Sequence, residues 1–292
     1  MEKEKIDLSI VILSYNSKAD LARLLPSVFG SETKYSYEVI VVDNGSSDGT
    51  PDWLISLFDG RQKVILIRNQ NNGFAHGNNL GIRQAQGKHI LILNPDTEFK
   101  PDTLQTMLEF METNQDVGIS TCKVLLPDGK LDLACRRRFP NLWNSFKRLI
   151  GLSSADYNML DTDEDQSMEI DSCMGAFLLI RKSVIEKVGL LDEKFFMYGE
   201  DLDWCWRAKE AGYKVWYYPK TSITHYKGSA SLKTPFKALK WFHGAMWIFY
   251  KKHYKNHYPF FLNWLVWLGI KIRLWILIII NFFRSEKFVS KR

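Results

Sequence analysis

The sequence predicts an α/β protein whose core is a mostly parallel, Rossmann-like sheet flanked by helices. Within the first hundred residues, four apolar runs rich in β-branched residues alternate with helix-like segments. Continuous apolar runs are typical of parallel strands that are buried on both faces, and the alternation favours crossover connections between neighbouring strands. The expected strands are IDLSIVILSY, YEVIVVDN, KVILIRN and KHILILN.

The segments between these strands have helical features. Apolar side chains recur at helical spacing after the first strand, at Leu21, Leu24, Leu25 and Val28. Proline is favoured at the first position of a helix. Further helices are therefore predicted to begin at Thr50-Pro51, to span 75–86 and to begin at Pro101.

Beyond residue 100 the strand and helix signals are less regular. ISTCKVLLPDGKLDL predicts a hairpin that turns at Asp128-Gly129, and the polar segment 151–169 predicts a mobile loop. We expect SCMGAFLLIRK to be a strand and EDLDWCWRAKEAG to be a helix. A last strand, KVWYYP, leads towards His225.

The C-terminal segment differs from the rest of the chain in charge and composition. The net charge is +6, but the residues from Lys227 onward carry 13 Lys and Arg and one acid, Glu286. A basic segment can bind nucleic acid or an anionic lipid surface. Because this one is rich in Trp, Phe, Leu and Ile, it favours lipid and argues against nucleic acid. We expect residues 231–292 to form a helical membrane-association tail.

Two apolar stretches of the tail leave its exact relation to the membrane open. Phe236–Tyr254 is aromatic and helix-like, and Pro259–Phe283 is almost entirely apolar apart from Lys271 and Arg273. Two cations near the middle make full spanning costly, so helices lying in the membrane surface are favoured. A spanning helix and a buried protein interface are the alternatives.

The N-terminal sequence and the cysteines indicate the cellular compartment. MEKEKIDLS has no apolar stretch after its charges, so we expect no signal or transit peptide and a cytoplasmic catalytic part. The four cysteines form no C-x-x-C pair, and reduced, buried thiols are expected.

The loops after the four expected strands carry small polar or acidic side chains. Parallel strands gather their ligand site at their carboxyl ends. Hydrogen-bonding side chains there suit a nucleoside, although ordinary turn chemistry explains any single loop equally well. No G-x-G-x-x-G or G-x-x-x-x-G-K-[ST] motif occurs, which argues against NAD and P-loop ATP binding. The candidates are Ser14, Tyr15, Asn16, Asp43, Asn44, Ser46, Gly73, Asn94 and Asp96.

Two residues are candidate ligands for a divalent cation. Asp96 ends the fourth apolar run, where a carboxylate can hold a metal that neutralises a diphosphate. His225 ends the last strand, and Lys227 follows it in the polar string HYKGS. Imidazole beside carboxylate and phosphate oxygens suits Mn²⁺ or Mg²⁺. A simple turn at Asp96 and a structural role for His225 are the alternatives.

The string FFMYGEDLDWCWR carries the strongest catalytic signal. Glu200, Asp201 and Asp203 place three acids within four residues at an expected helix start. Helix capping explains acids there, but a transferase also needs a carboxylate base for its acceptor hydroxyl. Trp204 and Trp206 are equally compatible with a stacking floor for an acceptor sugar and with the core.

The chain resembles family 2 glycosyltransferases of the GT-A fold, and most closely their rhamnosyltransferase-like bacterial group. The resemblance covers roughly residues 6–230 and depends on motifs that occur in the family's order. They are SIVILSYNS, EVIVVDNGSSDGT, NNGFAHGNNLGI, ILILNPD, CMGAFLLIRK, FFMYGEDLDWCWR and HYKGSA.

This resemblance implies roles for individual residues. Asp96 is implied as the metal-binding acid of a D-x-D-type motif in which Asn94 replaces the first Asp, and His225 completes metal or diphosphate binding. Asp201 is implied as the general base, with Glu200 and Asp203 positioning the base or the acceptor and Arg207 pairing with one of these acids. The implied nucleotide pocket contains Ser14, Asn16, Asp43, Gly73 and Asn78.

The resemblance also implies an activity and its partners. It implies a single displacement with inversion, in which Lys227 and the metal stabilise the leaving nucleoside diphosphate. The implied donor is a dTDP-rhamnose-like or UDP-sugar, bound by a nucleotide-binding half, 1–100. An acceptor-binding half, 101–230, is expected to bind a glycan acceptor, and the tail suggests that this acceptor is polyprenyl-diphosphate-linked. The expected location is the cytoplasmic face of the cell membrane, and the expected role is polysaccharide or cell-wall synthesis.

Three other functions remain open at this stage. Transfer to polyprenyl phosphate, as in dolichol-phosphate-mannose synthases, is disfavoured by the FFMYGEDLDWCWR string. An inactive nucleotide-sugar-binding scaffold is disfavoured by the presence of Asp96, Asp201 and His225. A glycosidase also uses two carboxylates but has no need of the nucleotide loops.

Overall fold

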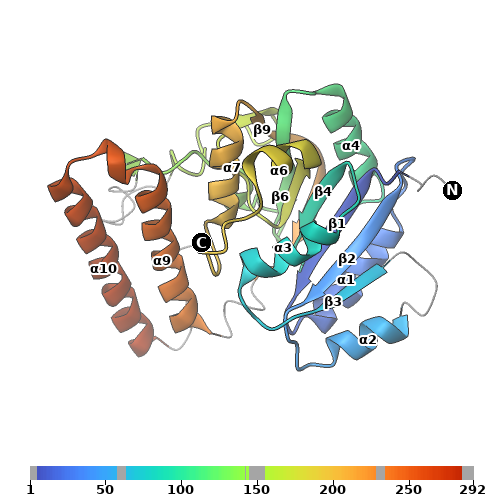
Figure 1. The fold of residues 1–292 in the computed structure, drawn as a ribbon, viewed down its shortest axis with the longest axis horizontal. Helices are drawn as coiled ribbons and strands as arrows, with labels where there is room; N and C mark the ends of the chain where they lie inside the picture. Colours follow the sequence, from blue (N-terminus) through green and yellow to red (C-terminus); the bar gives the residue numbers. More distant parts are fainter. Residues whose placement is uncertain (1–4, 58–63, 142, 145–154, 228–233, 285–292) are drawn as a thin grey trace.

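A single large sheet runs through the catalytic part of the chain, and a helical hairpin lies at one end of it (Figure 1). The computed structural model describes residues 5–57, 64–141, 143–144, 155–227 and 234–284. The strand order is β3-β2-β1-β4-β8-β6-β9-β5, with β7 pairing with β9. The sheet therefore joins the expected nucleotide-binding and acceptor-binding halves.

The first four strands form the predicted parallel unit. β1 pairs in parallel with both β2 and β4, and β2 with β3. Ser14 at the end of β1 lies opposite Asp43 at the end of β2, so the polar loops after these strands meet at one edge of the sheet. The strands are β1 (Leu8–Ser14), β2 (Tyr37–Asp43), β3 (Val64–Arg68) and β4 (His89–Leu93).

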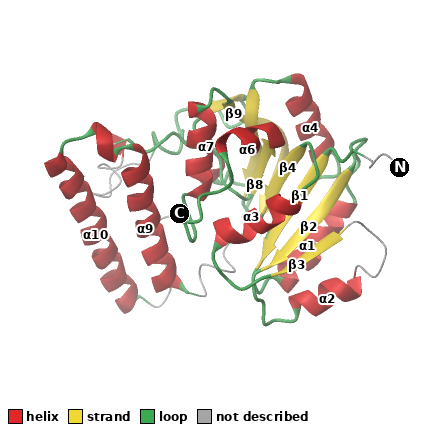
Figure 2. Cartoon of the chain, viewed as in Figure 1, coloured by secondary structure: helices red, strands yellow, loops and turns green. Residues whose placement is uncertain are grey.

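Helices cover both faces of this unit, with α3 in front of the sheet and α1 behind it (Figure 2). Their bounds are α1 (Lys18–Phe29), α2 (Thr50–Leu57) and α3 (Phe74–Gln84). α3 lies very close to β1, because a Cβ at Gly77 would come within 2.3 Å of Leu13 and one at Gly81 within 2.4 Å of Val11. The glycines at spacing four thus form the packing surface of α3.

The second half continues the sheet with mixed pairing. β8 is antiparallel to β4 and to β6, whereas β9 is parallel to β6 and antiparallel to β5. The strands are β5 (Thr97–Phe99), β6 (Val117–Leu125), β7 (Met168–Ile170), β8 (Phe177–Arg181) and β9 (Lys214–His225). The helices are α4 (Thr103–Thr113), the 3₁₀ turn η1 (Leu133–Cys135), α6 (Lys182–Val188) and α7 (Glu200–Glu210).

Two predictions for this half need correction. The predicted hairpin at Asp128-Gly129 is reduced to one isolated bridge between Leu125 and Leu131, because Leu133–Cys135 then forms η1 instead of a second strand. The predicted loop 151–169 falls partly outside the described residues, and its end forms β7, which pairs with β9. Its described turns are held to the body by Arg136, which donates to the carbonyls of Thr162 and Asp163.

The tail folds into two long helices that lie side by side (Figure 1). They are α9 (Pro235–His253) and α10 (Phe260–Phe283), with the 3₁₀ turn η2 (Lys255–His257) between them. α9 also packs on the catalytic body, where its Ala245 and Phe249 form a small core with Phe195 and Leu202. One tail helix is therefore part of the folded body.

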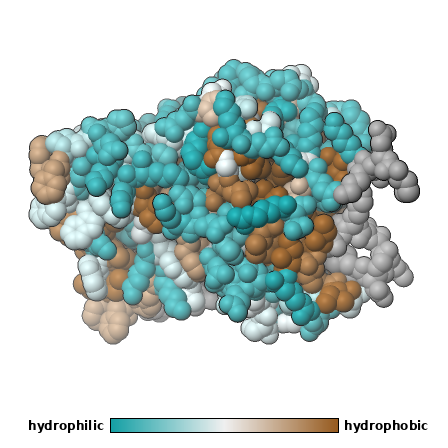
Figure 3. Space-filling model, viewed as in Figure 1, coloured by the Kyte–Doolittle hydropathy of each residue, from teal (hydrophilic) through white to brown (hydrophobic). Residues whose placement is uncertain are grey.

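α10 differs from α9 in what it exposes. Large apolar side chains, among them Trp264, Trp275 and Phe282, remain exposed along it, and apolar surface appears over the hairpin at the left of Figure 3. Within the described residues it is the one helix long and apolar enough to cross a membrane, with a mean hydropathy of 2.0.

Candidate active site

The pairing of β5 with β9 brings the two predicted metal ligands together. The antiparallel register sets Thr97 opposite His225, and the backbone N–H of Tyr226 donates to the carbonyl of Asp96 at 2.8 Å. This brings the His225 Nε2 to 3.2 Å from Oδ1 of Asp96. The two predicted metal ligands, 129 positions apart in sequence, are thus neighbours.

Asp132, which the sequence analysis did not single out, holds the other side of His225. Its buried carboxylate lies 3.1 Å from His225 Nδ1 and accepts from Lys227 Nζ at 2.7 Å. Burial lowers the pKa of His225, but the hydrogen bonds and charges of Asp132 and Asp96 outweigh it and raise the pKa to about 9. A carboxylate behind a histidine is the arrangement that fixes a metal-binding ring.

These residues fit a divalent cation that is shared with a diphosphate. Two ligands at right angles around Mg²⁺ or Mn²⁺, with bonds of about 2.1 Å, are about 3 Å apart, close to the separation of Asp96 and His225. Among the described residues, no group of three or more His, Cys, Asp or Glu side chains surrounds one point suitable for a metal. A two-ligand site that substrate oxygens complete is the arrangement that Mg²⁺ commonly uses with phosphates.

The loops after β1 and β2 are tied together at the cleft. The backbone N–H of Asn16 donates to Ser46 Oγ at 2.8 Å, and Asn16 Oδ1 accepts from the backbone of Ser47 at 2.7 Å. Asn44 forms side-chain hydrogen bonds with Asn69 and Asn71 in the loop after β3. Tyr15, Asn16, Asn44 and Gly73 all line the cleft.

Three predicted nucleotide-binding residues lie beneath the cleft instead. Ser14, Asp43 and Asn78 are buried and do not line it. Asp43 shapes its loop by accepting from the backbone of Gly45 and Ser46, and Asn78 donates to the carbonyl of Phe74. One oxygen of each side chain, Ser14 Oγ, Asp43 Oδ1 and Asn78 Oδ1, is buried without a hydrogen-bond partner among the described residues, and their contact with a nucleotide stays a prediction.

Gly73 joins the loop after β3 to the segment that precedes α7. Its φ of +101° favours glycine, and an added Cβ would come within 2.5 Å of the Phe196 carbonyl. That same carbonyl accepts from the backbone N–H of Phe74 at 2.6 Å. Glycine is therefore required at position 73 for two reasons: the backbone has a positive φ, and the Phe196 carbonyl leaves no space for a Cβ.

The first turn of α7 presents two carboxyl groups to the same cleft. Glu200 and Asp201 line it together with Asp96 and His225. Asp201 Oδ2 accepts from the guanidinium of Arg137 at 2.8 Å, and Arg137 also donates to the carbonyl of Cys173. A carboxylate fixed in this way keeps an orientation suited to accept a proton from a hydroxyl in the cleft.

Glu200 has a different environment from Asp201. One of its carboxyl oxygens is buried without a hydrogen-bond partner in the described structure. Burial, followed by the charge of Asp201, raises the pKa of Glu200. Neighbouring carboxyl groups with different environments are a common arrangement in acid–base sites.

The third acid, Asp203, points away from the cleft, and this corrects its predicted position at the reaction centre. It is fully buried and does not line the cleft. Its carboxylate pairs with Arg207 of its own helix and with Lys252 and His253 of α9. Burial raises the pKa of Asp203, but His253, Arg207 and Lys252 outweigh it and lower the pKa to about 2.

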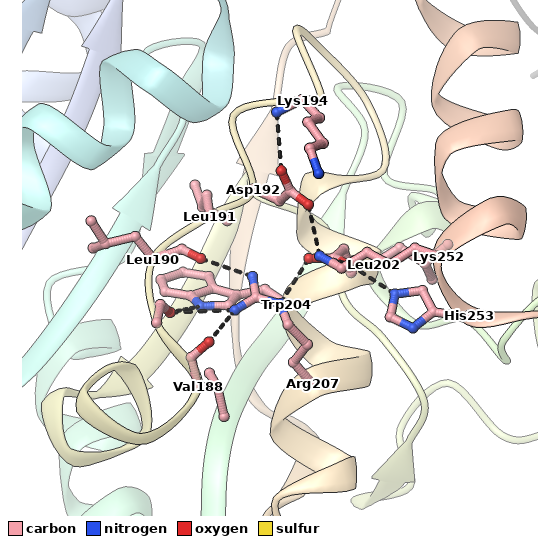
Figure 4. Close-up of polar contacts among 12 residues, drawn as sticks. Val188, Leu190, Leu191, Asp192, Lys194, Leu202, Trp204, Arg207, Lys252 and His253 are labelled. Carbon is pink, nitrogen blue, oxygen red and sulfur yellow. Dashed lines mark hydrogen bonds and ion pairs between the residues drawn. The ribbon is translucent and has the colours of Figure 1, made fainter.

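The predicted acceptor-binding residues Trp204, Trp206 and Arg207 do not line the cleft, which corrects their predicted contact with the acceptor. Figure 4 shows the surroundings of Trp204 and Arg207. Trp204 is fully buried and donates to the carbonyl of Gly189. Arg207 was predicted to pair with one of the three acids, and it pairs with Asp203. Its other N–H groups donate to the backbone carbonyls of Val188 and Leu190. Trp206 packs between Phe139, Phe249 and Tyr254. All three stabilise the junction of α7 with its neighbours.

The cleft is larger than a donor requires. Its volume is about 2980 Å³, whereas pockets for one small ligand measure roughly 300–1,000 Å³. The loops after β1, β2, β3 and β4 line one part, and α9 and α10 line another. There is room for two substrates in one continuous space.

Comparison with known proteins identifies the class to which this fold and site belong. The family model described as "Glycosyl transferase family 2" matches residues 9–189. This is more than half of the chain, and the chain therefore belongs to glycosyl transferase family 2. The predicted resemblance to the rhamnosyltransferase-like group is confirmed, because rhamnosyltransferases are among the relatives of this chain.

Curated relatives include transferases of surface glycans. The chain is 28% identical to the rhamnosyltransferase WbbL of Escherichia coli K12, over 80% of this chain and 88% of WbbL. It is 23% identical to the N-acetylglucosaminyl-diphospho-decaprenol L-rhamnosyltransferase of Mycobacterium tuberculosis H37Rv, over 96% and 95%. It is 29% identical to the low-salt glycan biosynthesis hexosyltransferase Agl10 of Haloferax volcanii, over 72% of this chain and 64% of Agl10.

Solved structures show the same fold. The mannosyltransferase PcManGT of Pyrobaculum calidifontis, solved with GDP-Man and Mn²⁺, aligns with a TM-score of 0.60 and 15% identity, over 93% of this chain and 70% of that one. Residues 1–349 of TarS from S. aureus align with a TM-score of 0.59 and 14% identity, over 92% and 71%. The fold is GT-A-like, as predicted.

Proposed function

We propose that this glycosyltransferase moves a rhamnose-like sugar or another hexose from a nucleoside diphosphate to a hydroxyl of a lipid-linked glycan, with inversion and with Mn²⁺ or Mg²⁺. One observation carries the proposal: Asp96, His225 and Asp201 line one cleft in a chain of glycosyl transferase family 2. The rhamnosyltransferases among its relatives support the donor class, and the decaprenol-dependent relative supports a lipid-linked acceptor.

In the proposed reaction, the acceptor oxygen bonds to the anomeric carbon while the bond from that carbon to the nucleoside diphosphate breaks. Asp201 takes the proton of the acceptor hydroxyl, and Arg137 keeps its carboxylate in place at 2.8 Å. A bound divalent cation supplies charge neutralisation for the leaving diphosphate. Asp96 and His225 hold that cation, and Lys227, anchored on Asp132, adds a positive charge beside it.

The donor half of the proposal is tested by a thermal-shift screen of UDP-, GDP- and dTDP-sugars with and without Mn²⁺. Binding to the folded state raises the melting temperature, and we expect a metal-dependent rise with dTDP- or UDP-sugars. Asp132→Asn frees His225 and Lys227 from their anchor, so it should remove most of the metal-dependent rise. Asp128→Asn, at an exposed turn in the same segment, is the control. No shift with any nucleotide sugar in folded protein would favour an inactive scaffold.

We also propose that the enzyme works on the cytoplasmic face of the cell membrane. The exposed apolar side chains of α10 support membrane contact, and four free, buried cysteines fit a reducing compartment. Deleting residues 259–292 should release the protein from membranes at moderate salt, as measured by sedimentation. A donor-induced thermal shift of the truncated protein is the control for folding. A truncated but folded protein that still sediments would contradict the proposal.

A further inference from the structure

The tail contributes cations as well as apolar side chains to the wall of the cleft. Lys237 of α9, Arg273 of α10 and Arg284 all line it, as do the apolar Leu265 and Ile270. From Lys227 onward the sequence contains a single acid, Glu286. The tail wall therefore offers positive charge beside hydrocarbon, in the cleft that Glu200 and Asp201 also line.

Arg273 is the most informative of these cations. A charge in the middle of an apolar helix is costly and is retained where it has a partner or a function. Its side chain turns inward towards α9, with Nη1 3.4 Å from His243 Nε2 and 3.9 Å from Met246 Sδ. His243 is buried, and its Nδ1 lies 2.8 Å from the carbonyl of Leu239.

The contact with Leu239 determines how His243 acts on Arg273. A carbonyl oxygen only accepts, so Nδ1 of His243 donates to it, and Nε2 of the neutral ring then carries the lone pair that faces Arg273. The ring thus orients the guanidinium with an uncharged acceptor. An oriented guanidinium with hydrocarbon beside it suits a phosphate group attached to an apolar chain.

We propose that the α9–α10 wall of the cleft binds the diphosphate linker of a lipid-linked acceptor, with Arg273 as its main contact and the lipid chain along α10. This rests on the proposed transferase function and names where its acceptor is held. The site lies in the same cleft as Asp201 and Asp96, which distinguishes it from a surface patch for membrane headgroups. An acceptor anchored there projects its sugar towards the base.

The test is direct binding of farnesyl diphosphate and of farnesol to the full chain in zwitterionic nanodiscs. EDTA is present, so that the diphosphate cannot enter the donor site through a metal. Arg273→Gln should weaken farnesyl diphosphate binding about tenfold or more, the size expected for a charged hydrogen bond, and leave farnesol binding unchanged. Lys271→Gln, an exposed cation two positions away on the same helix, is the matched control and should bind as the wild type does.

Several outcomes would overturn this assignment. Equal binding of farnesyl diphosphate and farnesol to the wild type would remove the diphosphate site. An equal loss in Arg273→Gln and Lys271→Gln would show general surface attraction. If Arg273→Gln instead lost binding only to vesicles containing phosphatidylglycerol, the ligand would be a membrane headgroup. A donor-induced thermal shift measured on the same variants reports the transferase function separately, so either proposal can fail alone.

Discussion

Two sides of α7 use the same kind of side chain for opposite purposes. On the cleft side, Glu200 and Asp201 line an open space together with Asp96 and His225. On the α9 side, Asp203 is fully buried and surrounded by Arg207, Lys252 and His253. A carboxylate that reacts needs access and a poised proton, whereas a carboxylate that joins helices needs full compensation of its charge. The surroundings, more than the residue type, determine which role each acid has.

The largest expected effect is on the cleft side. Asp201→Asn should lower the transfer rate by about 10²–10⁴, the usual contribution of a positioned base, while donor binding and folding persist. Single-turnover transfer and the donor thermal shift measure the two quantities separately. Asp203→Asn, assayed at a temperature where it is folded, is the contrasting variant and should retain most of its transfer. Near wild-type transfer by Asp201→Asn would remove Asp201 as the base.

The next effect is on the α9 side and concerns stability. Asp203→Asn leaves three cationic or polar partners around a buried neutral amide, and the free energy of unfolding should fall by about 3 kcal/mol. Urea denaturation at pH 7 measures this. Asp192→Asn also removes a partner of Lys252, but at a less buried position, and should cost less. Equal stability of Asp203→Asn and the wild type would contradict a role in joining α7 to α9.

The third prediction tests the comparison through the pH dependence of stability. Burial raises the pKa of Glu200 from 4.5 to about 8, so the folded state holds its proton where the unfolded state has lost it. Glu200 therefore costs stability increasingly as the pH rises from about 4.5 to about 8. Glu200→Gln should flatten this part of the stability profile and raise stability at pH 8 relative to the wild type. Denaturation at several pH values tests it, and an unchanged slope would show that Glu200 is ionised in the folded protein.

Sequence reasoning was most successful where local pattern determines structure. The four parallel strands were recognisable because each is a largely apolar run; β1, β2 and β4 are buried, whereas the apolar residues Ile65, Leu66 and Ile67 of β3 are half-buried. β5 and β7 were not recognisable, because each has only three residues and at least one of them is polar. Their existence depends on the long β9, with which both pair.

The site was partly predictable for the same reason. Asp96 and His225 were identified from loop chemistry, but Arg137 and Asp132 were missed, because their partners lie 64 and 93 positions away. Helix geometry alone separates Asp201 from Asp203, since two positions turn an α-helix by roughly 200°. The sequence could therefore exclude a shared site for these two acids. Which of them faces the cleft depends on the position of α9.

Phe196 has a consequence for attempts to recombine such enzymes. Its carbonyl accepts from Phe74 at the donor edge, and its ring stacks on Trp241 of α9 with centroids 4.5 Å apart. One residue thus connects the loop after β3 with the tail. A chimera in which only the tail is exchanged, from the start of α9, would lose the matched contact between Phe196 and Trp241. Swapping acceptor preference by grafting therefore requires moving the 195–199 segment together with the tail.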